Sequence, residues 1–94
     1  MGLNVVDDEE YQKYRDAMTP LMESYGGRFN YDFTIAEVLK SQTPAKINRV
    51  FIMSFESEHA MHDFFNDEAY LAIREKHFNL SVESITSLAE LAAG

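Results

Sequence analysis

The segment from Arg49 to Tyr70 constrains the fold most, because in it an apolar strand runs into a capped helix. Its first part, Val50-Phe51-Ile52-Met53, is apolar on both faces, which is typical of a central strand covered on both sides. Ser57 is a good helix N-cap, and apolar residues follow it at helical spacing. In a two-layer domain of this size the helices cover only one face of the sheet. We therefore expect a second subunit to cover the other face.

Length and composition indicate one packed domain over residues 1–94, with 46% hydrophobic and 26% charged residues. The formal charge of -8 argues against binding to nucleic acid or to an anionic membrane, because both need a cationic surface. The sequence has no Cys, which excludes disulfides and thiolate chemistry. It shows neither a signal-peptide pattern nor an apolar run long enough to cross a membrane, so we expect a cytoplasmic protein.

The first half of the chain predicts a short strand at residues 3–6 and then a helix over residues 8–25. Asp7 and Glu10 have the spacing of a capping box, in which each side chain bonds the other residue's amide. Pro20 lies inside the helical pattern, so we expect a kink or a short break there. Gly26 and Gly27 then end the helix.

From Arg28 the hydrophobic period changes to two. Phe29, Tyr31, Phe33 and Ile35 alternate with polar residues, which predicts an edge strand with these four side chains buried. A polar turn over residues 40–46 leads into a strand over residues 47–55. Ser57 and Asp67 each cap a further helical stretch, the second reaching about residue 80. We predict a last strand over residues 83–90, where a helix also fits the pattern.

This order of strand, helix, strand, strand, helix, strand predicts an α+β fold of the ferredoxin-like, split βαβ type. Its four-stranded sheet is antiparallel. The first and third strands should be central, with the second and fourth at the edges. That arrangement agrees with a third strand that is apolar on both faces.

Several short pieces in a fixed order carry a family resemblance that spans nearly the whole chain. They are Val6-Asp7-Asp8-Glu9-Glu10-Tyr11, Tyr14-Arg15, Tyr25-Gly26-Gly27-Arg28-Phe29, Arg49-Val50 through Phe55, Ser57, Ala60, Phe65-Asn66-Asp67-Glu68 and Tyr70. These pieces resemble an uncharacterised family of the dimeric α/β-barrel superfamily, the domain-of-unknown-function family 1330 (DUF1330). The resemblance implies two ferredoxin-like subunits packed sheet to sheet, and therefore a homodimer. The first strand is shorter than is usual in the family, and the tryptophan often found before the third strand is absent.

His59 and His62 are the clearest candidates for metal ligands, since they lie three residues apart on a helix beside Asp63. Two imidazoles do not complete a site, and His77 would have to supply a third ligand from elsewhere. Such a run is more often the solvated face of a helix. We therefore expect no metal site.

Five residues are candidates for binding a small molecule: Arg28, Tyr31, Arg49, Tyr70 and His77. A guanidinium gives planar, bidentate hydrogen bonding to an anionic or carbonyl group, and phenols and imidazole donate hydrogen bonds or protons. The alternatives remain open. Either arginine can form a structural ion pair, and tyrosines in an apolar stripe are usually core residues.

Three functions are compatible with these residues. The first is a homodimer that binds a small apolar or aromatic molecule between sheet and helices, because aromatic residues and methionines line such cavities adaptably. The second is a cofactor-independent monooxygenase or isomerase, in which Arg28 or Arg49 polarises a carbonyl. The third is a purely structural or interaction module. We expect no cofactor for any of them.

Overall fold

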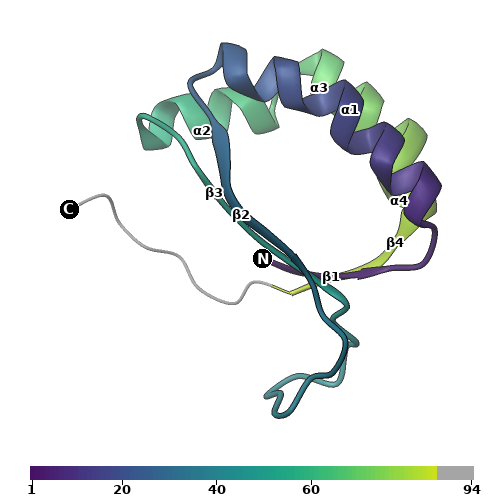
Figure 1. The fold of residues 1–94 in the computed structure, drawn as a ribbon. Helices are drawn as coiled ribbons and strands as arrows, with labels where there is room; N and C mark the ends of the chain where they lie inside the picture. Colours follow the sequence, from purple (N-terminus) through teal and green to yellow (C-terminus); the bar gives the residue numbers. More distant parts are fainter. Residues whose placement is uncertain (87–94) are drawn as a thin grey trace.

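The structure, a computed structural model, describes residues 1–86 and consists of one antiparallel sheet with helices on one of its faces (Figure 1). None of the helices within this range is long and apolar enough to cross a membrane. The elements are β1 (Gly2–Val5), α1 (Asp8–Ser24), β2 (Arg28–Thr34), β3 (Arg49–Ser54), α2 (Glu58–Phe65), α3 (Glu68–Ile73), the π-helical η1 (Arg74–Phe78), α4 (Asn79–Ser81) and β4 (Val82–Thr86).

The sheet has the strand order β2-β3-β1-β4, and every neighbouring pair is antiparallel. The α+β class, the four-stranded antiparallel sheet and the central positions of β1 and β3 are therefore confirmed. The last strand is confirmed from Val82 to Thr86. The remainder of its predicted range, residues 87–90, lies outside the described part of the chain.

The N-terminus of α1 confirms one half of the predicted capping box. The Asp7 carboxylate accepts a hydrogen bond from the Glu10 amide at 3.0 Å. The other half is wrong, because the Glu10 carboxylate bonds His77 Nδ1 at 2.6 Å instead of reaching back to Asp7. The Glu10 side chain, which local spacing assigns to the cap, therefore pairs instead with His77 on η1.

The C-terminal part of α1 is one uninterrupted helix through Pro20, so the predicted break does not occur. Met18 and Met22 flank the proline and are fully buried, and this packing holds both sides of the helix in place. Helix α1 ends just ahead of Gly26 and Gly27, as predicted. Gly26 has a φ of 76°, and the Gly26 and Gly27 amides donate to carbonyls of the last helical turn in a Schellman motif.

The helices that follow β3 confirm both predicted caps. Ser57 accepts a hydrogen bond from the Ala60 amide at 3.0 Å, and Asp67 accepts from the amides of Ala69 and Tyr70. Helical structure then continues from α3 through η1 and α4 to Ser81, which matches the predicted end near residue 80.

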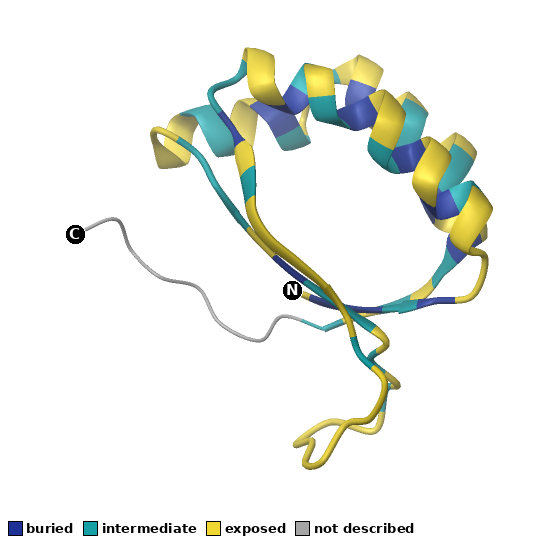
Figure 2. Cartoon of the chain, in the orientation of Figure 1, coloured by how far each residue is buried: buried dark blue, intermediate teal, exposed yellow. Residues whose placement is uncertain are grey.

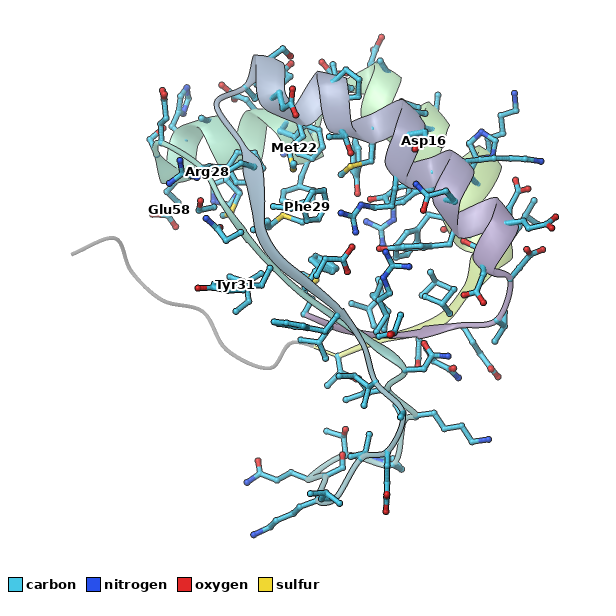
Figure 3. All side chains as sticks on the ribbon, in the orientation of Figure 1. Asp16, Met22, Arg28, Phe29, Tyr31 and Glu58 are labelled. Carbon is cyan, nitrogen blue, oxygen red and sulfur yellow. The ribbon has the colours of Figure 1, made fainter. Side chains whose placement is uncertain are left out.

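Strand β2 contains an irregularity that the sequence pattern does not reveal. Phe29 pairs with Met53 but Tyr31 pairs with Ile52, so Asn30 is an extra residue in this strand. A β-bulge of this kind reverses the faces of all the residues that follow it. The prediction of one buried face from Phe29 to Ile35 is therefore wrong. Figure 3 shows the result, with Phe29 directed toward the helices and Tyr31 away from them.

The core lies between the helices and the inner face of the sheet (Figure 2). Its polar centre is a hydrogen bond of 2.8 Å between the buried hydroxyls of Tyr14 and Tyr70. The buried hydrophobic residues are Leu3, Val5, Tyr11, Tyr14, Met18, Met22, Phe51, Phe64, Tyr70 and Phe78.

The outer face of the sheet carries no helix (Figure 2). Tyr31, Phe33 and Ile52 lie on it with 58%, 49% and 50% of their surface exposed. The Tyr31 and Phe33 rings are stacked, with their centroids 5.9 Å apart. We call the apolar surface formed by Tyr31, Phe33, Val50 and Ile52 the outer patch.

Candidate functional site

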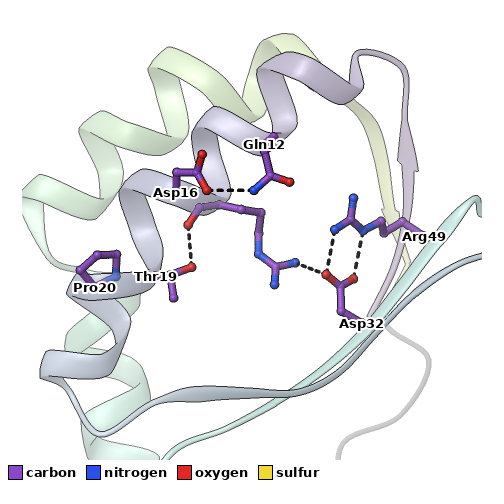
Figure 4. A pocket seen from close by; sticks show the side chains of 7 residues that line it. Gln12, Asp16, Thr19, Pro20, Asp32 and Arg49 are labelled. Carbon is purple, nitrogen blue, oxygen red and sulfur yellow. Dashed lines mark hydrogen bonds and ion pairs between the residues drawn. The ribbon is translucent and has the colours of Figure 1, made fainter.

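A hollow of about 390 Å³ opens between helix α1 and the strands β2 and β3 (Figure 4). Residues of α1 form one wall, and the facing wall comes from the inner face of the sheet. The side chains that line it are mostly polar: Gln12, Arg15, Asp16, Thr19, Pro20, Asp32 and Arg49.

An arginine–aspartate–arginine cluster crosses the hollow. Arg49 binds both carboxylate oxygens of Asp32, with Nε to Oδ1 at 2.9 Å and Nη2 to Oδ2 at 2.8 Å. Arg15, on the helix, adds a single bond from Nη1 to Oδ2 of the same carboxylate at 2.9 Å. One carboxylate therefore serves two guanidinium groups.

Aromatic rings hold both guanidinium groups in place. The Arg15 Cζ lies 3.5 Å from the centroid of the Phe29 ring, and the Arg49 Cζ lies 4.8 Å from that of Tyr11. Contacts of this kind are favourable because the face of an aromatic ring attracts a cation. The Tyr11 hydroxyl also accepts a hydrogen bond of 3.4 Å from Arg15.

The cluster carries one excess positive charge although the chain is strongly acidic. Hydrogen bonding from Arg49 lowers the pKa of Asp32, an effect that burial partly offsets and that Arg15 reinforces. The same hydrogen bond raises the pKa of Arg49. The carboxylate of Asp32 is therefore ionised at neutral pH, and because arginine side chains carry a positive charge in proteins, one positive charge is left unbalanced within the cluster.

Polar groups on α1 form the other wall. Gln12 Nε2 donates to Asp16 Oδ1 at 2.9 Å, and the Thr19 hydroxyl donates to the Arg15 carbonyl. The Asp16 carboxylate and the Thr19 oxygen keep capacity to accept hydrogen bonds. Hydrogen-bond acceptors of α1 therefore line the same hollow as the donors of the arginine cluster.

The five residues predicted from sequence do not come together. Arg49 lies in the hollow, whereas Arg28 is exposed and Tyr31 belongs to the outer patch. Tyr70 is only 3% exposed and bonds Tyr14 within the core. His77 pairs with Glu10 between η1 and α1, where that hydrogen bond is the main cause of a lowered pKa of Glu10.

Sequence reasoning missed the two partners of Arg49, which are Arg15 and Asp32. Arg15 follows Tyr11 by four residues, so it shares a helix face with an apolar residue, and this position was the available signal. Asp32 had no such signal. Strict alternation assigns it to the solvent side of β2, and only the bulge at Asn30 turns it inward.

The two histidines considered as metal ligands lie on the surface of α2. Their side chains are 88% exposed at His59 and 64% exposed at His62, and each contacts a carboxylate one turn away. Within residues 1–86 no three His, Asp or Glu side chains are placed to hold a metal ion together.

The fold is that of small α+β proteins in which helices cover one face of a four-stranded antiparallel sheet, and in this chain a charged hollow lies between the two layers. The chain belongs to the family described as Domain of unknown function (DUF1330), whose model matches residues 1–89. The resemblance noted from the sequence is therefore confirmed at the level of the family.

Solved structures support the fold. A crystal structure of RPA0582, a protein of unknown function from Rhodopseudomonas palustris, superimposes with a TM-score of 0.69 at 23% identity. The match covers 87% of this chain and 65% of that protein, so the chain spans less than two thirds of its length. A crystal structure of methylated RPA0582 gives the same TM-score and identity, with 64% of that chain covered. No curated protein matches the sequence.

Proposed function

We propose that the protein binds a small organic molecule with an anionic oxygen in the hollow between α1 and the sheet, and that it does so as a homodimer. The observation that carries the proposal is the unbalanced charge of the cluster: Arg15 and Arg49 share the carboxylate of Asp32. In a partly enclosed hollow such a charge interacts more strongly with an anion than it would in bulk water.

The polar lining of the hollow determines the kind of ligand. From the sequence we expected an apolar or aromatic molecule among Phe, Met and Tyr side chains, but Met18, Met22 and Phe64 are fully buried within the core. The space that is open carries guanidinium and carboxylate groups instead. An anion matches it better than a hydrocarbon does, because burying unpaired polar groups against an apolar surface is costly.

The outer patch supports the homodimer. Its exposed aromatic and aliphatic side chains are contiguous on a sheet face without a helix, and such surfaces commonly mark protein interfaces. The strand order β2-β3-β1-β4 is also compatible with the split βαβ, ferredoxin-like topology. We propose that two copies pack through this face as a dimeric α/β barrel.

Catalysis as an oxygenase or isomerase ranks second. Arg49 lines the hollow, and its guanidinium packs on the ring of a phenol, Tyr11, which is itself buried beneath the lining. Burial, however, raises the pKa of Tyr11, which makes its hydroxyl a poor proton donor or base near neutral pH. Binding requires only the charge that the cluster already has, so we place it first.

A thermal-shift screen of organic acids tests the proposal. Each acid (acetate, lactate, benzoate and succinate) is compared with the amide of the same skeleton at equal ionic strength. An acid at ten times its Kd stabilises the folded state by about 1.4 kcal/mol, which is a rise of roughly 5–10 °C in Tm for a domain of this size. We expect at least one acid to exceed its amide by this margin.

Two arginine variants make the screen specific to the hollow. Arg49→Gln should abolish the response, whereas Arg28→Gln, the same change on an exposed residue, should retain it. If no acid stabilises the wild-type protein more than its amide does, the proposed binding is wrong.

A further inference from the structure

We infer that Arg15, rather than Arg49, binds the anionic group of the ligand, and that this group is a carboxylate. This inference rests on the proposed function and adds to it the chemical class of the anion and the residue that binds it. Four features carry it: the unequal bonding of the two arginines, a buried N–H group, the shape of the free guanidinium edge and the charges around it.

Arg49 forms two hydrogen bonds with the Asp32 carboxylate, whereas Arg15 forms one. Arg49 gives Nε and Nη2 to the two carboxylate oxygens, so its side edge is fully engaged (Figure 4). Arg15 gives only Nη1, which it shares between Asp32 and the Tyr11 hydroxyl. Arg49 therefore acts as a positioning residue that fixes Asp32, and Arg15 keeps unused donors.

The Nε of Arg15 is buried and has no hydrogen-bond partner among residues 1–86, and no other side-chain nitrogen or oxygen of that range shares this condition. Buried polar groups are nearly always paired in folded proteins, so an orphaned one calls for an explanation. A ligand oxygen that reaches this N–H after a small rotation of the side chain supplies it. Pairing this N–H group with a ligand oxygen removes the cost of leaving a buried donor unsatisfied.

The free edge of Arg15 has the shape of a carboxylate receptor. The N–H bonds of its Nε and Nη2 atoms point in the same direction, and neither nitrogen forms a hydrogen bond with another group within the described chain. A guanidinium edge of this kind pairs with the two oxygens of a carboxylate in a planar, bidentate arrangement. A lysine at the same position would give the charge without the two parallel donors.

The surrounding charges favour one negative charge on the ligand. Asp32 stays on Arg49, and Asp16 also lines the hollow, so a dianion such as phosphate meets two carboxylates and only one unbalanced guanidinium. Asp16 and Thr19 lie on α1, the helix that also carries Arg15, and their oxygens line the same hollow. They suit a ligand that also donates hydrogen bonds, such as a hydroxy acid.

The test is a titration of ¹⁵N-labelled protein in which the arginine Nε–H signals are followed by NMR. The probes are acetate, lactate and benzoate, the three corresponding amides, and inorganic phosphate. The Arg15 signal is assigned by its disappearance in Arg15→Lys. We expect it to move saturably with at least one carboxylate and not with that carboxylate's amide, while the Arg49 signal keeps its position.

Calorimetry on the wild type and two variants completes the test. Arg15→Lys should bind the same carboxylate about tenfold more weakly or worse, because bidentate pairing is lost while the charge is kept. Arg28→Lys should bind as the wild type does. If Arg15→Lys fails to fold, the Arg15 Nε–H signal is assigned in the wild type through its side-chain correlations to the Arg15 backbone, and the wild-type titration then decides the question.

Each outcome separates the two proposals. A carboxylate that binds the wild type and Arg15→Lys equally well overturns the role of Arg15 and leaves the proposed function standing. Binding of phosphate but of none of the carboxylates overturns the carboxylate class alone. If none of these anions binds the wild-type protein, the proposed function fails and this inference fails with it.

Discussion

At the scale of single residues, Asp32 decides the charge of the hollow, because its carboxylate is the one group of the cluster that offsets Arg15 and Arg49. Its hydrogen bond to Arg49 is the largest cause of its lowered pKa. A carboxyl group whose pKa is lower in the folded than in the unfolded protein stabilises the fold wherever it is ionised. Because the pKa of Asp32 is lowered, this stabilisation is lost as the pH falls through the folded-state pKa, and it must be measured in acidic solution.

We predict that Asp32→Asn lowers the free energy of unfolding by about 2 kcal/mol at neutral pH, since two partly buried guanidinium groups lose their carboxylate. The deficit should be constant above the unfolded pKa of about 3.9 and should shrink as pH falls below it through the folded pKa. Urea unfolding of both proteins from pH 7 to pH 3 measures this. Asp16→Asn, which changes an exposed carboxylate, is the control. A deficit that persists unchanged at pH 3 would contradict the ion-pair explanation.

The buried hydroxyl pair of Tyr14 and Tyr70 gives a second prediction at this scale. Tyr14→Phe should cost about 1–2 kcal/mol of stability, because it leaves the Tyr70 hydroxyl buried without a partner. The double variant with Tyr70→Phe should cost less than the sum of the two single changes. A double-mutant cycle by urea unfolding measures the coupling, and strict additivity would show that the hydroxyls do not interact.

At the scale of elements, local signals were predictable and long-range ones were not. The caps at Asp7, Ser57 and Asp67 depend on residues within one helical turn, so their spacing in the sequence was sufficient. The bulge at Asn30 depends on the pairing of β2 with β3, and the continuity of α1 through Pro20 depends on core packing. The local sequence pattern therefore predicts neither the bulge nor the continuity of the helix.

The candidate site follows the same division. Arg49 was recognisable because a charged residue begins an apolar strand. Asp32 was not, since its inward direction exists only downstream of the bulge. The site therefore depends on one inserted residue in an edge strand, and bulges are often found beside functional sites for this reason.

The Schellman motif that ends α1 gives a prediction at this scale. Gly26 has a positive φ of 76°, so Gly26→Ala should destabilise the protein by about 1–2 kcal/mol. Gly26→Asn should cost less, because asparagine tolerates this conformation better. Thermal unfolding of the three proteins measures the order. Equal stability of glycine and alanine at this position would contradict the assigned helix end.

At the scale of the whole molecule, the sheet separates two surfaces with different roles. Helices cover its inner face and leave its outer face bare (Figures 1 and 2). The core and the hollow lie against the inner face, and the outer patch lies on the outer face. The sequence predicted the need for cover from the two apolar faces of residues 50–53. The single chain supplies that cover on one face only, and Ile52 remains 50% exposed.

We predict that the wild-type protein sediments as a dimer at micromolar concentration and that Ile52→Lys sediments as a monomer, because a charge in the centre of the outer patch opposes its burial. Leu71→Lys, a change at a residue 46% exposed in the helical layer, should leave the dimer intact. Analytical ultracentrifugation measures all three proteins. A wild-type monomer would refute the dimer and leave the binding site unaffected.

The most direct measurement of the central claim is a map of backbone amide shifts during titration with the acid that gives the largest thermal shift. Binding in the hollow predicts saturable changes at Gln12, Asp16, Thr19 and Asp32, with a single Kd for all of them. Amides of the outer patch should keep their positions. Saturable changes confined to the outer patch, or none that saturate anywhere in residues 1–86, would contradict the proposal that this hollow is a binding site for organic anions.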